Sequence, residues 1–295
     1  MADAGFLLVD KPEGWTSHDV VARVRRLAGI DKVGHAGTLD PMATGLLVLG
    51  LGRATRLLRF VTDLPKVYAA TMVMGVATDT LDATGAVLER EPMEVEEDDL
   101  VGATGRFIGT IAQVPPMVSA IKVGGRRLYE VAREGGEVER EPRMVEIHSI
   151  DVLDFAPGPY PEAVIRVECG SGTYIRTLAD DLAGALGGRA HLSALRRHSN
   201  GSLTTDDAFT VEQLDAAADE DRLWPLVLSP AEGLRDLPAI TLDADRARAA
   251  LTGSVFTAAA LGGGSGLHRI LDEEGTLLAV YDLSGTRAKP EVVLS

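Results

Sequence analysis

A short apolar run, "LLVLG" at residues 46–50, stands near the end of the segment "GHAGTLDPMATGLLVLGLG", which covers residues 34–52. An apolar run of this length with glycines at its ends favours a buried β-strand. The turn before it holds an imidazole, His35, and a carboxylate, Asp40, among glycines and next to Pro41. A buried strand anchors that turn. Asp40 is therefore either a residue that holds the turn before Pro41 or a chemical group delivered to a cleft.

An ionised carboxylate beside a buried strand is costly unless it faces solvent, caps a turn or pairs with a cation. Arg176 in "GSGTYIRTL" is the best candidate for that cation, because Gly170 and Gly172 allow close approach of the backbone. A guanidinium at this place would keep Asp40 ionised and therefore nucleophilic. A surface arginine on an amphipathic helix fits the same residues equally well, and the residues alone leave both interpretations open.

Strand-like and helical segments are interspersed along most of the chain. Apolar spacing predicts a helix that starts after Thr16 or Ser17 as its N-cap and ends at Gly29. Alternating apolar residues predict a strand over "VYAATMVMGVAT", residues 67–78. The regular strand–helix repeat of a doubly wound sheet is missing from the sequence pattern. We therefore expect a mixed α/β (α+β) fold with a central, largely antiparallel sheet flanked by helices.

The composition and the secondary-structure pattern of the sequence change after Leu234. A short helical stretch, "DADRARAALTG", precedes the glycine-rich "GGGSG" and three strand-like stretches, "LHRILD", "TLLAVYDL" and "KPEVVLS". About sixty residues of this kind favour a small, mostly β domain. The sequence therefore predicts a larger domain over residues 1–235 and a smaller one over residues 236–295.

The net charge of −15 argues against a nucleic-acid ligand, because phosphate binding calls for clustered Lys and Arg. The distribution of charge argues the other way, since acidic residues gather in two stretches, 89–99 and 206–245. Basic residues form four other clusters: Arg23, Arg25 and Arg26; Arg53, Arg56 and Arg59; Lys122, Arg126 and Arg127; and Arg189, Arg196 and Arg197. This polarity fits an anionic ligand on one face, and ordinary solvated helix faces are the alternative.

Composition disfavours several classes of protein. The sequence has no apolar run of the length of a membrane span, and its start shows no basic region followed by a long apolar core. The single cysteine, Cys169, excludes an internal disulfide and a multi-cysteine metal cluster, and we expect it to be a buried packing residue. We therefore expect a cytoplasmic protein that does not bind membranes.

Two stretches match ligand-binding motifs weakly. "LLVLGLGRAT" contains the "GLG" of a dinucleotide fingerprint, but Thr55 stands where the third glycine belongs. "TDTLDATG" offers Asp79 and Asp82 but lacks the alternating oxygens and the distal Glu of a calcium loop, and the histidines show no zinc-type pairing. We therefore expect no nicotinamide cofactor and no metal site.

Six segments, taken together and in order, resemble the bacterial tRNA pseudouridine synthases of the TruB type, which act on uridine 55 of the TΨC loop. The segments are "DKPEGWTSHDVVARVRR", "GHAGTLDPMATGLLVLGLGRATRLL", "KVYAATMVMGVATDTLDATG", "QVPPMVSAIKVGGRRLYEVAREG", "GTYIRTLADDLAGALGG" and "HLSALRRHSNGSL". They cover most of residues 6–205. The resemblance implies the pseudouridine synthase fold and isomerisation of a tRNA uridine, with no cofactor and no obligate protein partner.

The resemblance also implies three catalytic residues. Asp40 matches the family's aspartate nucleophile, which attacks either carbon 6 of uracil or carbon 1′ of ribose, and both routes need the same carboxylate. Tyr68 matches the tyrosine that stacks on the flipped base and is a candidate base for proton removal. Core packing is the alternative that its place on a strand favours. Arg176 matches the arginine that pairs with the aspartate.

Four further residues match positions that bind the substrate in the family. His35 matches the histidine that fills space in the RNA loop and contacts RNA once the target base is extruded. Tyr174 and Leu195 match residues that line the uridine pocket. Asp82 matches an active-site acid, which we interpret as an orienting group.

A mobile insertion of the family corresponds to about residues 113–140 and carries Lys122, Arg126 and Arg127, which would meet phosphates. The tail from residue 236 is PUA-like by length and strand content, with few basic residues. Two alternatives remain at this point: a pseudouridine synthase with another RNA target, and a module that binds or folds tRNA. A pure binder has no need of a carboxylate such as Asp40 facing a flipped base.

Overall fold

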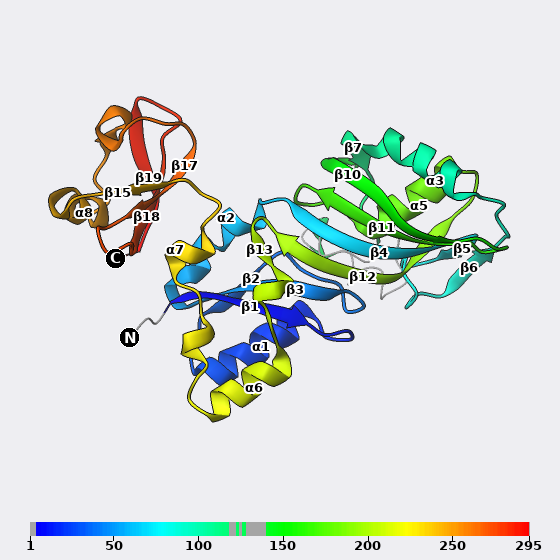
Figure 1. Ribbon diagram of the computed structural model, residues 1–295, viewed down its shortest axis with the longest axis horizontal. Coiled ribbons are helices and arrows are strands. Elements are labelled where there is room, and N and C mark those ends of the chain that lie inside the picture. The colour runs from blue at the N-terminus through cyan, green and yellow to red at the C-terminus, as the bar shows by residue number, and fades with distance from the viewer. Residues whose placement is uncertain (1–3, 118–121, 124–125, 128–139, 295) are drawn as a thin grey trace. The chain divides into compact units, whose positions relative to one another are not determined.

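The computed structural model describes residues 4–117, 122–123, 126–127 and 140–294. Its internal contacts divide the chain into two compact units. The first unit consists of Met1–Pro41, Gly45–Asp63 and Asn200–Ser295, and the second of Met42–Thr44 and Leu64–Ser199. Strands and helices are mixed in both units, which confirms the α+β class (Figure 1).

The first unit holds a sheet in which β14, β1 and β3 are neighbours in that order, with β2 also paired to β3. The elements up to the C-terminal region are β1 (Gly5–Lys11), α1 (Ser17–Ala28), β2 (Val33–Ala36), β3 (Thr44–Leu51), the 3₁₀-helix η1 (Gly52–Leu57), α2 (Leu58–Thr62), β13 (Leu203–Thr204), η3 (Thr205–Asp207), β14 (Phe209–Thr210), α6 (Val211–Asp219), η4 (Trp224–Leu226) and α7 (Pro230–Gly233). All pairs except the parallel β1–β14 are antiparallel. Residues 45–51 of β3 are buried, which confirms the strand that the apolar run predicts.

Helix α1 has the ends that its sequence predicts. Thr16 is the N-cap, since its hydroxyl accepts a bond from the Asp19 N–H, and the Asp19 carboxylate accepts from Thr16 in return. The hydrogen bonds from the Thr16 hydroxyl and N–H hold the pKa of Asp19 below its usual value. Gly29 ends the helix with a φ of 63°, a left-handed conformation that glycine adopts without strain. Ser17 is therefore the first residue of the helix and not its cap.

The second unit holds a sheet with the strand order β12, β4, β11, β10, β7. Its elements are β4 (Lys66–Met74), β5 (Val76–Thr78), β6 (Val87–Arg90), α3 (Glu97–Thr104), η2 (Gly105–Phe107), β7 (Gly109–Gln113), β8 (Lys122–Val123), β9 (Arg126–Arg127), β10 (Arg143–Ala156), β11 (Glu162–Cys169), α5 (Ile175–Ala185) and β12 (Ala190–Asn200). Along β4 buried and half-buried residues alternate without a break, as the period-2 pattern predicts. The β4–β11, β11–β10 and β10–β7 pairs are all antiparallel.

Strand β10 is 14 residues long, and the sequence pattern does not predict it. Its register against β11 shifts twice, between Ile147 and Ser149 and between Val152 and Asp154. Each shift breaks the alternation of inward and outward side chains, because the extra residue reverses the faces that follow it. The period-2 signal is therefore lost although the strand is long.

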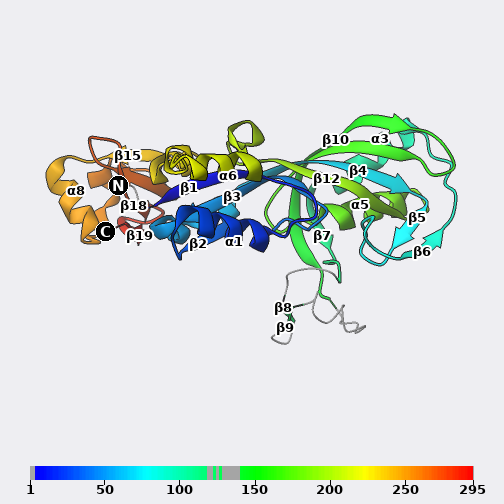
Figure 2. The ribbon, with the colours of Figure 1, turned by 90° about the horizontal axis from the view of Figure 1, so that it is seen from below.

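The C-terminal region forms its own five-stranded sheet, ordered β15, β17, β18, β19, β16, with α8 beside it (Figures 1 and 2). Its elements are β15 (Ala239–Thr241), α8 (Ala244–Leu251), β16 (Phe256–Thr257), η5 (Ala258–Leu261), β17 (Leu267–Leu271), β18 (Leu277–Asp282) and β19 (Arg287–Val293). Ten buried residues between Leu242 and Ala288 form a separate hydrophobic core. This core confirms a C-terminal β region, and the domain boundary near residue 235 stays a prediction.

Cys169 lies at the end of β11 and is fully buried, which confirms its interpretation as a packing residue. Burial raises the pKa of its thiol to about 11, so the thiol stays protonated at neutral pH. No helix within the described part of the chain is both long and apolar enough to cross a membrane.

Asp181 on α5 carries a pH-dependent destabilisation. Burial, and secondarily the charge of Asp180, raise the pKa of Asp181 from 3.8 to about 6. Because the folded-state pKa is the higher one, the ionised carboxylate destabilises the fold above pH 6, and this cost is absent below the unfolded pKa of 3.8.

Asp181→Asn is therefore expected to raise the melting temperature at pH 8. After discounting the raised pKa for solvent screening of a half-exposed group, we expect a gain in the free energy of unfolding of about 1 kcal/mol, or roughly 2–4 °C. Thermal unfolding of both proteins from pH 3.5 to pH 8 measures the effect. The two melting curves should converge at the acid end, and a constant difference across the range would contradict the assignment to Asp181.

Candidate active site

Asp40 lies in the loop between β2 and β3 and is half-buried. The residue before it, Leu39, is buried, and both of its backbone polar groups bond to one side chain. The Leu39 N–H donates to the Ser17 hydroxyl oxygen at 2.9 Å, and the Ser17 hydroxyl donates to the Leu39 carbonyl oxygen at 3.2 Å. The first residue of α1 therefore holds the peptide group that leads into Asp40.

The other side of the loop is held by Lys11, which has no exposed surface. Its Nζ donates to three carbonyl oxygens, those of Pro12 at 2.9 Å, Trp15 at 2.6 Å and Pro41 at 3.3 Å. The Gly14 N–H donates to the same Pro41 oxygen at 2.8 Å. A buried ammonium is tolerated when its donors are satisfied in this way. The two residues that flank Asp40, Leu39 and Pro41, are therefore both held by hydrogen bonds.

His35 is half-buried on β2, and its ring lies edge-on to the ring of His18, with 5.7 Å between the centroids. A surface hollow of about 500 Å³ adjoins both rings. Arg25 and Lys32 also line it, and the side chain of Leu58 forms part of its wall. Asp31 lines it as well, so the two cations outnumber the one acid and the surface is net positive, as an anionic ligand needs.

In the second unit, Asp82 is the centre of a buried hydrogen-bond network. Its Oδ1 accepts bonds from the Thr80 hydroxyl at 2.8 Å, the Thr84 N–H at 3.0 Å and the Thr84 hydroxyl at 2.5 Å. Its Oδ2 lies 3.4 Å from Nη1 of Arg176. The backbone of Asp82 also forms an isolated parallel β-bridge with Leu192 of β12. These contacts hold the carboxylate in one orientation, which fits the predicted orienting role.

Arg176 is on the first turn of α5, and its side chain is 2% exposed. Its Nη1 donates to the Thr80 carbonyl oxygen at 2.6 Å and pairs with Asp82, whose side chain is 6% exposed. The interpretation of Arg176 as a surface arginine is therefore wrong, because its guanidinium is buried against an acid. The pairing of Arg176 with Asp40 stays a prediction.

Tyr174, Tyr68 and Leu195 belong to three different elements of the second unit. Tyr174 is the N-cap of α5, and the side chain of Gln113 holds its backbone by two hydrogen bonds. The Tyr174 N–H donates to Gln113 Oε1 at 2.8 Å, and Gln113 Nε2 donates to the Tyr174 carbonyl oxygen at 3.0 Å. Tyr68 is buried on β4, and Leu195 is buried on β12, the strand next to β4. Their places fit pocket residues and core residues alike, so their roles stay predictions.

The predicted phosphate contacts Lys122, Arg126 and Arg127 have side chains that lie outside the described residues. Their backbones form the antiparallel pair β8–β9. The other basic clusters are interpreted above as a surface for an anionic ligand. That interpretation changes in part, because several of their arginines bond to acidic side chains of the protein. Arg23 pairs with Asp215 of α6 at 2.6 Å, and Arg189 bonds to Asp180 through two nitrogens.

A row of three arginines on η1 and α2 faces the C-terminal strand. Arg53, Arg56 and Arg59 stand at every third residue, the period of a 3₁₀-helix, and all three are exposed. Arg53 donates to the carbonyl oxygen of Leu294 at 3.2 Å and Arg56 to that of Val293 at 2.8 Å. Arg59 bonds both the carbonyl and the carboxylate of Glu291. We call these residues the arginine row.

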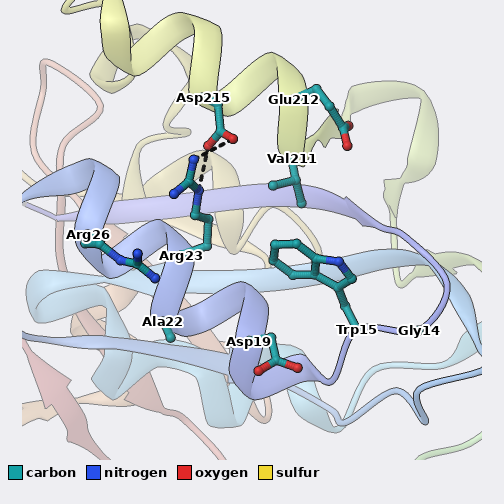
Figure 3. A pocket seen from close by; sticks show the side chains of 9 residues that line it. All are labelled: Gly14, Trp15, Asp19, Ala22, Arg23, Arg26, Val211, Glu212 and Asp215. Carbon is teal, nitrogen blue, oxygen red and sulfur yellow. Dashed lines mark hydrogen bonds and ion pairs between the residues drawn. The ribbon is translucent and has the colours of Figure 1, made fainter.

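A second surface hollow, of about 630 Å³, lies between α1 and α6 (Figure 3). The indole of Trp15 lies at one end, and the Arg23–Asp215 ion pair connects the two helices. None of the predicted site residues lines this hollow. It is therefore a feature of the helix pair and not part of the candidate site.

Sequence reasoning misses five residues that hold predicted site residues or their neighbours: Lys11 and Ser17 in the first unit, and Thr80, Thr84 and Gln113 in the second. Thr80 and Thr84 had a local signal, since threonines two residues either side of an aspartate commonly bond to it. Lys11 and Gln113 act over long sequence distances, for which one sequence offers no signal. Among the residues that the structure describes, no group of three His, Cys, Asp or Glu side chains is arranged to hold a metal ion.

Solved structures share this fold over almost the whole chain. A chain of the archaeal box H/ACA sRNP Nop10-Cbf5 complex matches with a TM-score of 0.74 and 24% identity, over 99% of this chain and 86% of that chain. A chain of a Cbf5-Nop10-Gar1 complex matches with the same TM-score and 25% identity, over 99% and 84%. The fold is therefore shared with a chain of each of these complexes, which confirms the expected fold class.

Family models and relatives identify the chain more closely. A model of the TruB family pseudouridylate synthase N-terminal domain matches residues 25–175, and one of the tRNA pseudouridylate synthase B C-terminal domain matches residues 176–234. Proteins named tRNA pseudouridine synthase B are 50% identical in Symbiobacterium thermophilum, over 84% of this chain and 82% of that protein, and 44% identical in Thermobifida fusca, over 100% and 99%. The chain belongs to the TruB family of pseudouridylate synthases. It is therefore an enzyme, an isomerase, as the sequence predicts.

Proposed function

We propose that this enzyme converts uridine 55 in the TΨC loop of tRNA to pseudouridine, with Asp40 as the nucleophile. Family membership supports pseudouridine formation in tRNA. The observation that carries the proposal is the half-buried carboxylate of Asp40 in a loop whose two neighbouring residues are held by buried side chains. A rigid carboxylate is what an attack on one defined carbon requires.

The reaction breaks the bond between ribose and uracil nitrogen 1, rotates the base and forms a bond from the ribose to uracil carbon 5. No atom is lost or gained, there is no net change of oxidation state and no water is consumed. Asp40 forms and later releases one covalent bond, and the proton that leaves carbon 5 is replaced by one on nitrogen 1. Tyr68 or a water molecule would accept the carbon 5 proton. The chemistry therefore needs no cofactor.

A uridine stacked inside an RNA loop is out of reach of a carboxylate, so the base must first be flipped, at a cost of a few kcal/mol. Stacking on an aromatic ring offsets part of that cost, and Tyr68 is the proposed platform. His35 beside its positive hollow is the proposed residue that fills the vacated space. Tyr174, Leu195 and Asp82 would then bind and orient the flipped base.

Incubation of the protein with an unmodified tRNA transcript, followed by mapping of pseudouridine at nucleotide resolution, tests the proposal. We expect modification of uridine 55 and of a stem-loop that contains the TΨC loop alone. Modification at another uridine would overturn the position, and tight binding without any modification would overturn the catalytic proposal in favour of a binding module.

The affinity for tRNA is expected to fall steeply with added salt, because each phosphate contact releases counterions. Replacing Arg126 and Arg127 by Gln should reduce the slope of log affinity against log salt by about 1.5, at roughly 0.7–0.9 for each contact. Binding titrations between low and moderate salt measure the slope.

Arg246→Gln with Arg248→Gln is the matched control, since it also removes two positive charges. These arginines lie on α8 and already pair with Asp243 and Asp245. The control should keep the slope of the unmodified protein. Equal slopes for all three proteins would argue against an RNA contact at residues 126 and 127.

A further inference from the structure

We propose that Ser17 is a positioning residue for Asp40, acting through the backbone of Leu39. The proposal rests on the proposed function, because it concerns the position and orientation of the Asp40 carboxylate that attacks the uridine. Ser17 is the first residue of α1 and is 1% exposed. Neither the sequence pattern nor the family resemblance assigns it a role in catalysis.

The two hydrogen bonds of Ser17 reach both peptide groups of one residue. The Leu39 N–H belongs to the peptide that joins Thr38 to Leu39, and the Leu39 carbonyl belongs to the peptide that joins Leu39 to Asp40. The Ser17 hydroxyl bonds the first at 2.9 Å and the second at 3.2 Å. It therefore restrains the orientation of the peptide plane that immediately precedes the Cα atom of Asp40.

The hydroxyl of Ser17 is not needed for the helix itself. Thr16 already caps α1, and its side chain accepts the bond from the Asp19 N–H. Helix α1 is in turn anchored by Val20 and Val24, which are buried. Ser17 thus connects an anchored helix to a loop that has no regular secondary structure, and this connection is its specific contribution.

Removing the hydroxyl releases one side of the loop only. In Ser17→Ala the Lys11 and Gly14 bonds to the Pro41 carbonyl remain, while the Leu39–Asp40 peptide loses its bond to Ser17. A misplacement of a reacting group by about 1 Å costs on the order of 100-fold in rate. We therefore expect the single-turnover rate of pseudouridine formation to fall about 10- to 100-fold, with the dissociation constant for tRNA within twofold of the unmodified protein.

Thr16→Ala is the matched control, one residue earlier on the same helix. It removes the cap of α1 and lowers the melting temperature, but it leaves both bonds between Ser17 and Leu39 in place. Rates of all variants are compared at a temperature well below the lowest melting temperature. Thr16→Ala should then keep its rate within twofold, so that a loss of rate in Ser17→Ala cannot be assigned to general destabilisation of the helix.

Asp40→Asn separates the two proposals. If Asp40→Asn is inactive and Ser17→Ala has the rate of the unmodified protein, the positioning role is overturned while the proposed function stands. If Asp40→Asn is active, the nucleophile assignment fails and the positioning role fails with it. Should Ser17→Ala not fold, Ser17→Cys decides, because a thiol is a weaker donor and acceptor. An unchanged rate in folded Ser17→Cys overturns the proposal, and a fall of fivefold or more supports it.

Discussion

Asp40→Asn is expected to abolish pseudouridine formation and to leave the affinity for tRNA unchanged. Asparagine has the size of aspartate but is not a nucleophile, so we expect a loss of at least about 10⁴-fold in rate, as for other enzymes without their nucleophile. The loop itself should persist, because the bonds from Lys11 and Ser17 reach the backbone of the neighbouring residues. Pseudouridine mapping and a binding titration with the same transcript measure both quantities.

Asp63→Asn is the control for this change, since Asp63 is an exposed carboxylate at the end of α2 in the same unit. It should have the activity and affinity of the unmodified protein. Measurable pseudouridine formation by pure Asp40→Asn would refute the nucleophile assignment. A parallel loss of tRNA binding would instead place Asp40 in substrate binding.

Asp82→Ala is expected to destabilise the fold by about 3–5 kcal/mol, because it removes one partner of a buried ion pair. Arg176 loses a carboxylate 3.4 Å away, and the hydroxyls of Thr80 and Thr84 lose an acceptor at the same time. The free energy of unfolding in urea measures the effect. Pseudouridine formation should also fall, since Asp82 is the proposed orienting group.

Asp151→Asn offers a comparison within the same unit. Asp151 lies 3.5 Å from Arg166, and both side chains are about half exposed, so this ion pair is screened by water. Its loss should change the free energy of unfolding by less than about 1 kcal/mol. If Asp82→Ala were as mild as Asp151→Asn, the buried network around Arg176 would not contribute to stability as proposed.

Local features of the sequence predict local features of the structure well. The capping residues of α1 and α6 lie within three residues of the groups that they bond, so the sequence contains both partners. Strand β3 is an uninterrupted apolar run and β4 an uninterrupted alternation, and both were predictable for those reasons. Strand β10 was not, because two register shifts interrupt its period.

The candidate site was predictable as a set of residues but not as a set of contacts. Arg176 and Asp82 are 94 residues apart, and one sequence contains no signal that joins them. Ser17 was considered as a helix cap, since Ser and Thr are equally suitable for that role. The structure shows that Thr16 caps the helix by accepting from the Asp19 N–H, while Ser17 bonds to Leu39 of the loop. Charge clusters were misleading in the same way, because the sequence does not show which acceptor a basic side chain bonds.

The arginine row shows that a positive field and a positive binding site are separate properties. Arg53 and Arg56 donate to neutral carbonyl oxygens, so their charges still add to the potential within about a Debye length, roughly 8–10 Å, whereas Arg59 also pairs with the Glu291 carboxylate. A phosphate that took the two-pronged contact preferred by guanidinium groups would share those donors with the last strand. The short-range bonds of the row therefore hold residues 291–294, while its net positive charge acts at longer range.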